Sequence, residues 1–314
     1  MKKPFVPSFR NKDVVAIARC AGDAIMHELA NTATLGVQQK TDDSPVTSAD
    51  RRANEIVLAG LKELTPDIPI LSEEDTPEHQ QWVMQQEIYW CVDPLDGTRT
   101  AVKYSEGNTQ YDGFGTLIGL VHRGVPVFGV AHYPNNPSRD DASRGVTYFT
   151  STNGTIAYRQ HGDEAPEPIQ AKPCFQHPLQ VAEGWGGDRL ANLCGQPVLG
   201  SKEVGGSRII RAAEGAVHTG YMGGSKAESF GFWDVAGPHA ILRAAGGEIM
   251  TIPGDFAQHQ QAGALQNAEP LRYDGRHYAA GIGAGKPYVP LSVGAHKETL
   301  RMLGAPDREA SITR

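Results

Sequence analysis

The chain of 314 residues lacks the features that mark several large classes of protein. It has four cysteines but no Cys-x-x-Cys pair, and no two histidines stand four residues apart, so neither a disulfide framework nor a zinc site is indicated. We therefore expect free thiols in a reducing cytoplasm. No run of about 18 apolar residues is present, and Pro4, Pro7 and nearby charges interrupt the N-terminal segment, so neither a transmembrane helix nor a signal peptide is expected.

The chain also lacks an excess of basic residues. Its 29 lysines and arginines are outnumbered by 36 aspartates and glutamates, which gives a net charge of −7. Proteins that bind nucleic acids usually present a basic surface to the phosphate backbone. We therefore expect no nucleic acid as partner, and the missing apolar run argues against a membrane. A small anionic substrate is compatible with this charge if bound cations reverse the local electric field.

Two amphipathic helices are predicted near the N-terminus, because apolar residues recur at helical spacing from Asp13 to about Ala30 and from Ser48 to Leu64. Ser48 is the candidate N-cap of the second helix. Apolar segments separated by turn residues then predict strands and two hairpins. The expected strands are residues 68–71, 88–92, 115–121, 125–133, 145–150 and 155–159.

The length of the chain is sufficient for two modest domains. A segment with four prolines among mixed charges, residues 162–178, is the best candidate boundary. We predict an N-terminal α+β domain built on an antiparallel sheet over residues 1–165. Strands and helices alternate after it, which predicts a smaller α/β domain over residues 166–314. Near the C-terminus a helix is expected from about Ala295 to Leu303.

The most informative segment, residues 91–98, has the sequence Cys-Val-Asp-Pro-Leu-Asp-Gly-Thr. The apolar run before it predicts a buried strand that ends at Asp93 and Asp96, and Gly97 and Thr98 are typical of a turn that begins a helix. Carboxylates suit a hard divalent cation, and free N–H groups at a helix start suit an anion. An ordinary acidic turn has the same residue types, so this segment by itself favours neither interpretation.

Acidic residues recur at two further element ends. Ser72-Glu73-Glu74-Asp75 follows directly after a short predicted strand. In the second half, Asp234 lies at the start of a predicted helix that Gly246-Gly247 ends. An aspartate in this position is usually only a helix cap, worth about 1 kcal/mol.

Taken in order, the segments Leu71–Asp75, Asp93–Thr98 and Trp233–Gly237 resemble the motifs of the inositol monophosphatase superfamily of magnesium-dependent, lithium-sensitive phosphatases. The resemblance extends from about Val14 to about Ile282 and implies a layered αβαβα fold. Residues 40–50 and 71–75 are most similar to the 3′(2′),5′-bisphosphate nucleotidase branch. Enzymes of that branch remove one phosphate from adenosine 3′,5′-bisphosphate. The members are often dimers, so the resemblance is compatible with a homodimer, but no interface can be read from the sequence.

The resemblance also implies roles for particular residues. Two or three Mg²⁺ ions would be held by Glu73, Asp93, Asp96, Asp234 and the carbonyl oxygen of Leu95. Glu73 and Thr98 would orient the attacking water, and Asp50 would accept a hydrogen bond from the Thr98 hydroxyl. The candidate substrate contacts are Gly97, Thr98, Ser207, Arg208 and Asp234.

Three of these assignments have alternatives. Side chains alternate along an extended segment, so only one of Glu73 and Glu74 should face the metals, and the family pattern favours Glu73. Arg208 is either a surface cation or a contact to a second phosphate. Residues 40–50 are either a flap over the metals with Asp50 at its base, which we favour, or a surface turn.

The substrate is less well determined than the chemistry, because residues 103–115 and 222–231 depart from the nucleotidase branch. A phosphatase acting on inositol monophosphate or another small sugar or metabolite phosphate is the nearest alternative. A regulatory protein without catalysis on the same scaffold is another. A regulatory protein without catalysis is expected to have lost a metal ligand, whereas all the candidate metal ligands are present in this sequence. The glycine-rich residues 281–285 are expected to be a strand end rather than a nucleotide-binding loop.

Overall fold

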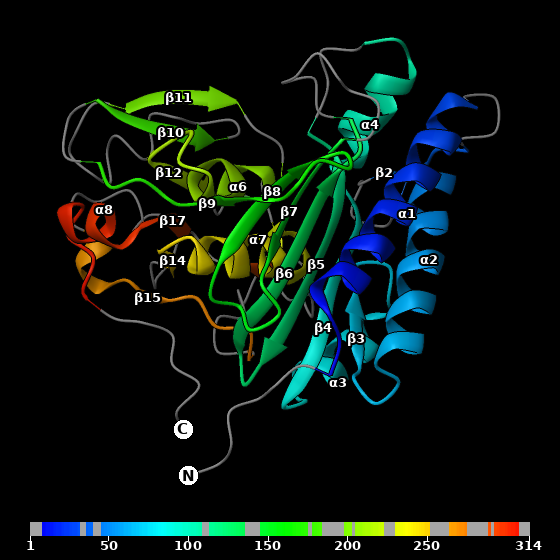
Figure 1. The fold of residues 1–314 in the computed structure, drawn as a ribbon, viewed down its shortest axis with the longest axis horizontal. Coiled ribbons are helices and arrows are strands. Elements are labelled where there is room, and N and C mark those ends of the chain that lie inside the picture. The colour runs from blue at the N-terminus through cyan, green and yellow to red at the C-terminus, as the bar shows by residue number, and fades with distance from the viewer. Residues whose placement is uncertain are drawn as a thin grey trace.

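Two large β-sheets form the centre of the molecule (Figure 1). The structure is a computed structural model. It describes residues 8–31, 36–39, 45–108, 113–135, 145–174, 178–183, 198–202, 205–222, 230–251, 264–274, 288–289 and 292–307. The expectations for residues 40–44, 223–229 and 281–285 and for Cys194 lie outside these ranges. Cys20, Cys91 and Cys174 are free thiols, as predicted.

The larger sheet has seven strands in the order β3-β4-β5-β6-β7-β8-β9. Strand β3 is parallel to β4, and every other pair is antiparallel. This confirms the predicted antiparallel sheet and both hairpins. The strands are β3 (Ile70–Ser72), β4 (Ile88–Asp96), β5 (Gly115–His122), β6 (Val125–Tyr133), β7 (Val146–Thr150), β8 (Ala157–His161) and β9 (Glu167–Ile169).

Strand β9 was not expected from the sequence. It lies within the proline-rich segment 162–178 and pairs with β8, so the first sheet continues to Ile169. Pro168 is tolerated there because β9 is an edge strand, where one missing N–H donor leaves no ladder bond unmade. The division of the chain into residues 1–165 and 166–314 stays a prediction.

Helices α1 (Asn11–Ala30) and α2 (Ser48–Leu64) pack side by side on one face of this sheet (Figure 1). The predicted cap of α2 is wrong by one residue, because Thr47 is the N-cap and accepts a hydrogen bond from the backbone N–H of Ala49. Ser48 instead donates to Glu28 of α1 at 2.6 Å. Two shorter helices, α3 (Pro77–Met84) and α4 (Thr98–Ser105), and the small strands β1 (Gln38–Gln39) and β2 (Pro45–Val46) complete this half.

The second sheet has six strands in the order β11-β10-β12-β17-β14-β15. It is mixed, because β10 pairs in parallel with β11 and β12, whereas β17 runs antiparallel to β12 and β14. The strands are β10 (Leu179–Glu183), β11 (Val198–Lys202), β12 (Thr219–Met222), β14 (Gly247–Thr251), β15 (Glu269–Pro270) and β17 (Ser292–His296). A separate small pair joins β13 (Phe230–Gly231) to β16 (Tyr288–Val289).

The remaining helices complete the layers. Helices α6 (Ser207–Ala213) and α7 (Phe232–Ala244) lie between the two sheets, and α8 (Lys297–Met302) lies on the outer face of the second sheet (Figure 1). The order of layers is therefore αβαβα, as the resemblance implied. The helix that was predicted over residues 295–303 begins two residues later than expected, at Lys297, because residues 292–296 pair as a strand. A 3₁₀ helix, η4, covers Ala264–Asn267.

Alternation along each strand divides the core between the layers. On β5, Leu117 faces the cluster around α7, whereas Ile118 faces the cluster under α1 and α2. None of the helices in the described part of the chain has the length and apolar character required to cross a bilayer.

Helix α7 approaches the first sheet unusually closely, because glycines meet where they cross. A Cβ atom on Gly129 of β6 would lie 2.3 Å from the carbonyl oxygen of Gly237, and one on Gly119 of β5 would lie 2.7 Å from the carbonyl carbon of Ala236. The backbones touch where side chains would otherwise separate them. This contact sets how deeply α7 sits against the sheet.

Candidate metal and phosphate site

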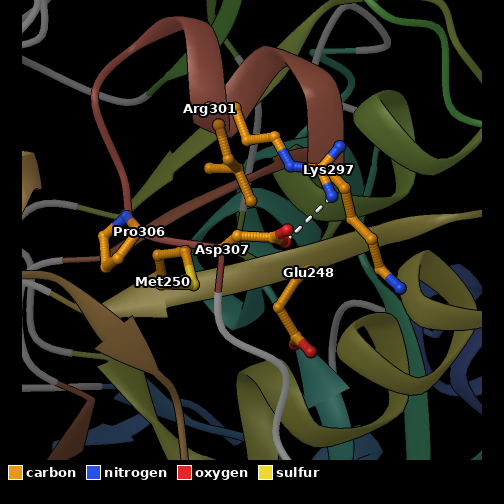
Figure 2. Close-up of a pocket in the computed structure, with 7 residues that line it drawn as sticks. Glu248, Met250, Lys297, Arg301, Pro306 and Asp307 are labelled. Atoms are coloured by element: carbon orange, nitrogen blue, oxygen red, sulfur yellow. Dashed lines mark hydrogen bonds and ion pairs between the residues drawn. The ribbon is translucent and has the colours of Figure 1, made fainter.

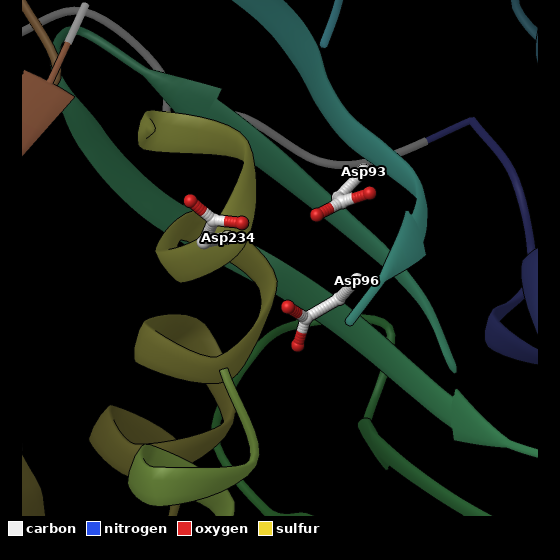
Figure 3. A group of neighbouring side chains, drawn as sticks. All are labelled: Asp93, Asp96 and Asp234. Carbon is white, nitrogen blue, oxygen red and sulfur yellow. The ribbon is translucent and has the colours of Figure 1, made fainter. Parts of the chain in front are cut away.

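Three aspartates meet where β4 ends and α7 begins. One carboxylate oxygen from each of Asp93, Asp96 and Asp234 lies within 4.8 Å of the others. Figure 3 shows Asp93 and Asp96 on the strand and Asp234 on the facing helix, with the three side chains converging. The predicted metal ligands from the two halves of the sequence are therefore brought together.

A β-bulge is the reason that Asp93 and Asp96 can face the same way. Residues three apart on a regular strand point to opposite faces. Here the register shifts, since Asp93 pairs with Leu117 and Asp96 with Gly115, so one extra residue is inserted on β4. Pro94 lies in the bulge, where its missing N–H costs no ladder bond. Leu95 turns toward the α1 and α2 side, and Asp96 returns to the side of α7.

The three carboxylates are too crowded to be ionised together without a cation. Burial raises the pKa of Asp93 and of Asp234 well above the ordinary range, and repulsion from the neighbouring acids raises both further. Burial, with repulsion from Glu73, also raises the pKa of Asp96 to about 7, although hydrogen bonding to Gly206 and attraction to Arg208 oppose the shift. A cluster of oxygen ligands with excess negative charge fits a hard divalent cation.

Glu73 lies near this cluster without being one of the three converging acids. Its backbone N–H donates to the carbonyl of Val92, the residue before Asp93 on β4. Its negative charge raises the pKa of Asp93 and Asp96. This effect of Glu73 supports the choice of Glu73 over Glu74, and the role of Glu73 as a ligand stays a prediction.

Thr98 and Asp50 form the predicted hydrogen bond. Thr98 Oγ1 donates to Asp50 Oδ1 at 2.8 Å and also lies 3.2 Å from the carbonyl oxygen of Leu95. Asp50 Oδ2 accepts the backbone N–H and the hydroxyl of Thr47, at 2.7 and 2.6 Å, so the carboxylate is fixed on both sides. Burial raises the pKa of Asp50, although these hydrogen bonds oppose the shift.

The start of α4 supplies the predicted anion-binding turn. Gly97 is its N-cap and has φ +83°, a left-handed conformation that favours glycine. Thr98 is the first residue of the helix. The backbone N–H groups at such a helix start have no partner within the helix and suit phosphate oxygens.

A contact that the sequence did not reveal joins α6 to the cluster. The backbone N–H of Gly206 donates to Asp96 Oδ2 at 2.8 Å. Gly205 has φ +41°, and a Cβ atom there would lie 1.8 Å from Asp96 Oδ1. The paired glycines before α6 were visible in the sequence, but nothing local indicated that a carboxylate 110 positions earlier required the space.

Arg208 is a buried cation, so its interpretation as a surface residue is wrong. It is 6% exposed, and its guanidinium carbon lies 4.8 Å from the centre of the Phe230 ring. Its charge favours ionisation of Asp96. Ser207, the first residue of α6, is likewise buried. Contact of either residue with substrate stays a prediction.

Comparison with known proteins agrees with this geometry. The profile of the Inositol monophosphatase family matches residues 11–281. The 3′(2′),5′-bisphosphate nucleotidase CysQ of Salmonella typhimurium is 44% identical over 244 residues, which cover 76% of this chain and 89% of the relative. The enzyme of the same name from Aggregatibacter actinomycetemcomitans is 28% identical over 87% of this chain and 90% of its own.

Solved structures show the same fold. The crystal structure of CysQ from Bacteroides thetaiotaomicron superposes with a TM-score of 0.63 at 25% identity, and covers 91% of this chain and 97% of its own. The inositol monophosphatase from Anabaena has a TM-score of 0.59 at 20% identity, over 94% and 93% of the two chains. With a family profile that matches most of its length, and with the aspartates of two of the three motifs gathered in one cluster, the chain belongs to the inositol monophosphatase family.

Proposed function

We propose that this protein is a magnesium-dependent phosphomonoesterase that hydrolyses the 3′-phosphate of adenosine 3′,5′-bisphosphate. The observation that carries the proposal is the buried cluster of Asp93, Asp96 and Asp234, which two halves of the chain build together. The 44% identity to a 3′(2′),5′-bisphosphate nucleotidase over most of both chains supports the choice of substrate.

The metal would be held by the side chains that converge on the end of β4. Asp93, Asp96 and Asp234 supply the central oxygens, with Glu73 and the carbonyl of Leu95 beside them. We propose two or three Mg²⁺ ions, because two balance the charge of four carboxylates and a third balances that of a bound phosphate monoester. When bound, magnesium supplies charge neutralisation and Lewis acidity toward a phosphate ester and a water molecule.

Thr98 and Asp50 would orient the attacking water. Because the Thr98 hydroxyl hydrogen is directed at Asp50 Oδ1, the lone pairs of Oγ1 are left to accept a hydrogen bond. A water that donates to Thr98 Oγ1 and to Glu73 is held with its own lone pair free for attack on phosphorus. The N–H groups of Gly97 and Thr98 would bind the phosphate oxygens at the start of α4.

Arg208 would recognise the second phosphate of the substrate. The proposal is supported by the burial of this cation and by its attraction to Asp96. Arg208 lies two residues after Gly206, whose backbone N–H donates to the same carboxylate. Phe230 packs against its guanidinium, which limits the conformations that the long side chain can adopt. Ser207 at the start of the same helix is a second polar group for this end of the substrate.

Phosphate release from a panel of esters tests the proposal. With Mg²⁺ present, we expect the highest kcat/KM on adenosine 3′,5′-bisphosphate and lower values on inositol 1-phosphate, fructose 1,6-bisphosphate and adenosine 5′-monophosphate. Preference for inositol 1-phosphate would overturn the substrate and retain the chemistry. No turnover of any ester by the metal-loaded protein would favour a regulatory role on this scaffold.

We further propose that the protein acts in the cytoplasm as a homodimer. The cytoplasmic location is supported by the free thiols of Cys20, Cys91 and Cys174 and by relatives that act on small phosphorylated metabolites. The dimer rests on the family resemblance, and sedimentation at micromolar concentration measures it directly.

A further inference from the structure

A series of hydrogen bonds links four buried residues of β4, α7, β14 and the segment that follows β15. Tyr89 of β4 donates its hydroxyl hydrogen to the carbonyl oxygen of Tyr273 at 2.5 Å. The hydroxyl of Tyr273 lies 3.2 Å from His239 Nδ1, and His239 Nε2 bonds to Glu248 Oε1. We call this set, Tyr89, Tyr273, His239 and Glu248, the buried relay.

The direction of each hydrogen bond follows from burial. All four residues are 2% exposed or less. Burial lowers the pKa of His239, so the imidazole is neutral and has one N–H donor and one acceptor nitrogen. Nε2–H therefore donates to the Glu248 carboxylate, and Nδ1 accepts from the Tyr273 hydroxyl. Each of these side-chain hydrogen bonds pairs one donor with one acceptor, which makes the arrangement specific.

Glu248 is held as an anion at the end of the relay. Burial alone raises its pKa, but His239, Arg243 and the backbone N–H of Ile249 outweigh burial, so the pKa is lowered overall. Ile249 N–H donates to Oε1 at 3.0 Å, and Arg243 lies 3.6 Å from Oε2. Figure 2 shows Glu248 beside a pocket between β14 and α8, with its carboxylate directed away from the Arg301–Asp307 ion pair.

The relay connects the two elements that carry the metal ligands. Tyr89 lies four residues before Asp93 on the same face of β4, and His239 lies five residues after Asp234 on α7. Tyr273 contacts α7 a second time, because its ring packs edge-on against Phe232 at 4.9 Å between centroids. Its backbone N–H donates to Gly124 in the turn between β5 and β6. Tyr273 is therefore bonded to the first sheet and contacts α7 at two residues, His239 and Phe232.

We propose that the buried relay holds α7 at the position along and around its axis at which Asp234 meets Asp93 and Asp96. Tyr273 and His239 are then positioning residues of the metal centre, and the inference rests on the metal site of the proposed function. The glycine contacts with β5 and β6 set the depth of α7, and its position along and around its axis needs contacts with a defined direction as well. Directional hydrogen bonds are such contacts.

Tyr273→Phe is the sharpest variant, because it removes only the hydroxyl that reaches His239. The ring against Phe232 and the carbonyl that accepts from Tyr89 remain. The matched control is Thr65→Val, which removes a buried hydroxyl that accepts from Trp90 Nε1 at 2.9 Å. Trp90 is the neighbour of Tyr89 on β4 but faces α1 and α2, so this control loses a hydrogen bond to the same strand on the side away from α7.

Calorimetric titration of each purified full-length protein with Mg²⁺ gives the decisive measurement. We expect Tyr273→Phe to bind Mg²⁺ about five- to tenfold more weakly than the wild type. This loss does not exceed the smallest losses expected when a direct hydrogen-bond partner of a metal ligand is removed. We expect the Kd of Thr65→Val to stay within about twofold of the wild type, although its Tm falls. At saturating Mg²⁺ the substrate KM of Tyr273→Phe should be unchanged.

Equal Mg²⁺ affinity in Tyr273→Phe and the wild type would overturn the inference, and so would equal weakening in both variants. If Tyr273→Phe does not fold, Tyr89→Phe removes the first hydrogen bond of the relay and is measured in its place, with the same expected loss. Failure of the wild type itself to bind Mg²⁺ would instead contradict the proposed function. The two failures are therefore distinguishable.

Discussion

Asp96 is the residue at which the two halves of the site meet. It shares the cluster with Asp93 and Asp234 and accepts a hydrogen bond from Gly206 of the second half. Its pKa rises from 3.8 to about 7 mainly because it is buried, so the metal-free folded protein keeps a proton that the unfolded chain releases. The stability of the metal-free protein should therefore fall as pH rises from about 4 to about 7.

Asp96→Asn should abolish Mg²⁺-dependent phosphate release and stabilise the metal-free protein at pH 8. The amide has no charge to bury, and its oxygen can still accept from Gly206. Urea unfolding in EDTA at pH 5 and pH 8 should show a smaller loss of stability between these pH values than in the wild type. Near-full activity of the variant would show that the metal assignment is wrong.

His132 shows the opposite sign of pH dependence. It is 1% exposed, and its Nδ1 lies 3.0 Å from Thr147 Oγ1. Burial, with repulsion from Arg19, lowers the pKa of His132 from 6.5 to about 3. The folded state therefore resists a proton that the unfolded chain accepts, so this contribution to stability is complete above pH 6.5 and is lost as pH falls toward 3.

His132→Asn should reduce the acid sensitivity of folding, because asparagine keeps a polar atom near the position of Nδ1 and does not titrate. The wild type should lose up to about 1.4 kcal/mol of stability per pH unit more than the variant between pH 6 and pH 4. Urea unfolding at several pH values measures the difference. Parallel pH profiles would contradict the prediction.

At the scale of single elements, the position of α7 against the first sheet decides whether Asp234 reaches Asp93 and Asp96. Gly129 on β6 leaves no room for a Cβ atom, because the carbonyl oxygen of Gly237 would lie 2.3 Å away. Gly129→Ala must push the helix outward or distort the strand. We expect a loss of about 1 to 3 kcal/mol in stability from overpacking, together with weaker Mg²⁺ binding.

The matched control for this prediction is Val130→Ala. Val130 is the next residue on β6 but packs toward α1 and α2, so its truncation should lower stability by about 1 to 3 kcal/mol and leave Mg²⁺ affinity unchanged. Thermal unfolding and Mg²⁺ titration of both variants separate the effects. Equal Mg²⁺ affinity in the two variants would show that the depth of α7 does not matter to the site.

The elements themselves were largely predictable, and the differences have local physical causes. Helix α2 was predicted with both ends correct, and only its cap differs, because Thr47 and Asp50 bond reciprocally and leave Ser48 free to reach Glu28. The last two residues of strand β17, Ala295 and His296, were predicted to begin a helix. The strand is extended because β12 and β14 supply partners on both sides.

At the scale of the whole molecule, the metal should act as a cross-link between the two halves. Asp93 and Asp96 belong to the first sheet, and Asp234 belongs to a helix that lies between the sheets. A cation that binds only the folded arrangement stabilises it by about 2.7 kcal/mol at one hundred times its Kd. We therefore expect Tm to rise with Mg²⁺ concentration and to fall again with EDTA.

This stabilisation should grow as pH rises from 6 to 8. Asp93, Asp96 and Asp234 all have a raised pKa, so metal binding must displace protons, and fewer protons compete at higher pH. Scanning calorimetry with and without Mg²⁺ at both pH values measures the effect. A pH-independent shift, or the same shift in Asp234→Asn, would contradict binding at this cluster.

The sequence by itself determined most of the first half of the fold, because apolar periodicity is a local signal of helices and strands. It predicted the reaction chemistry through the order of three acidic motifs that resemble those of a known family. It also predicted the Thr98–Asp50 hydrogen bond, through the family resemblance.

Only the tertiary structure decided how those motifs fit together. The bulge that turns Asp96 toward Asp93, the approach of Gly206 to Asp96 and the burial of Arg208 each depend on a partner far along the chain. The buried relay is the clearest case, because Tyr89, Tyr273, His239 and Glu248 have no local pattern in common. Their chemistry appears only where β4, α7 and β14 pack together, since hydrogen bonds between distant residues leave no periodicity in sequence.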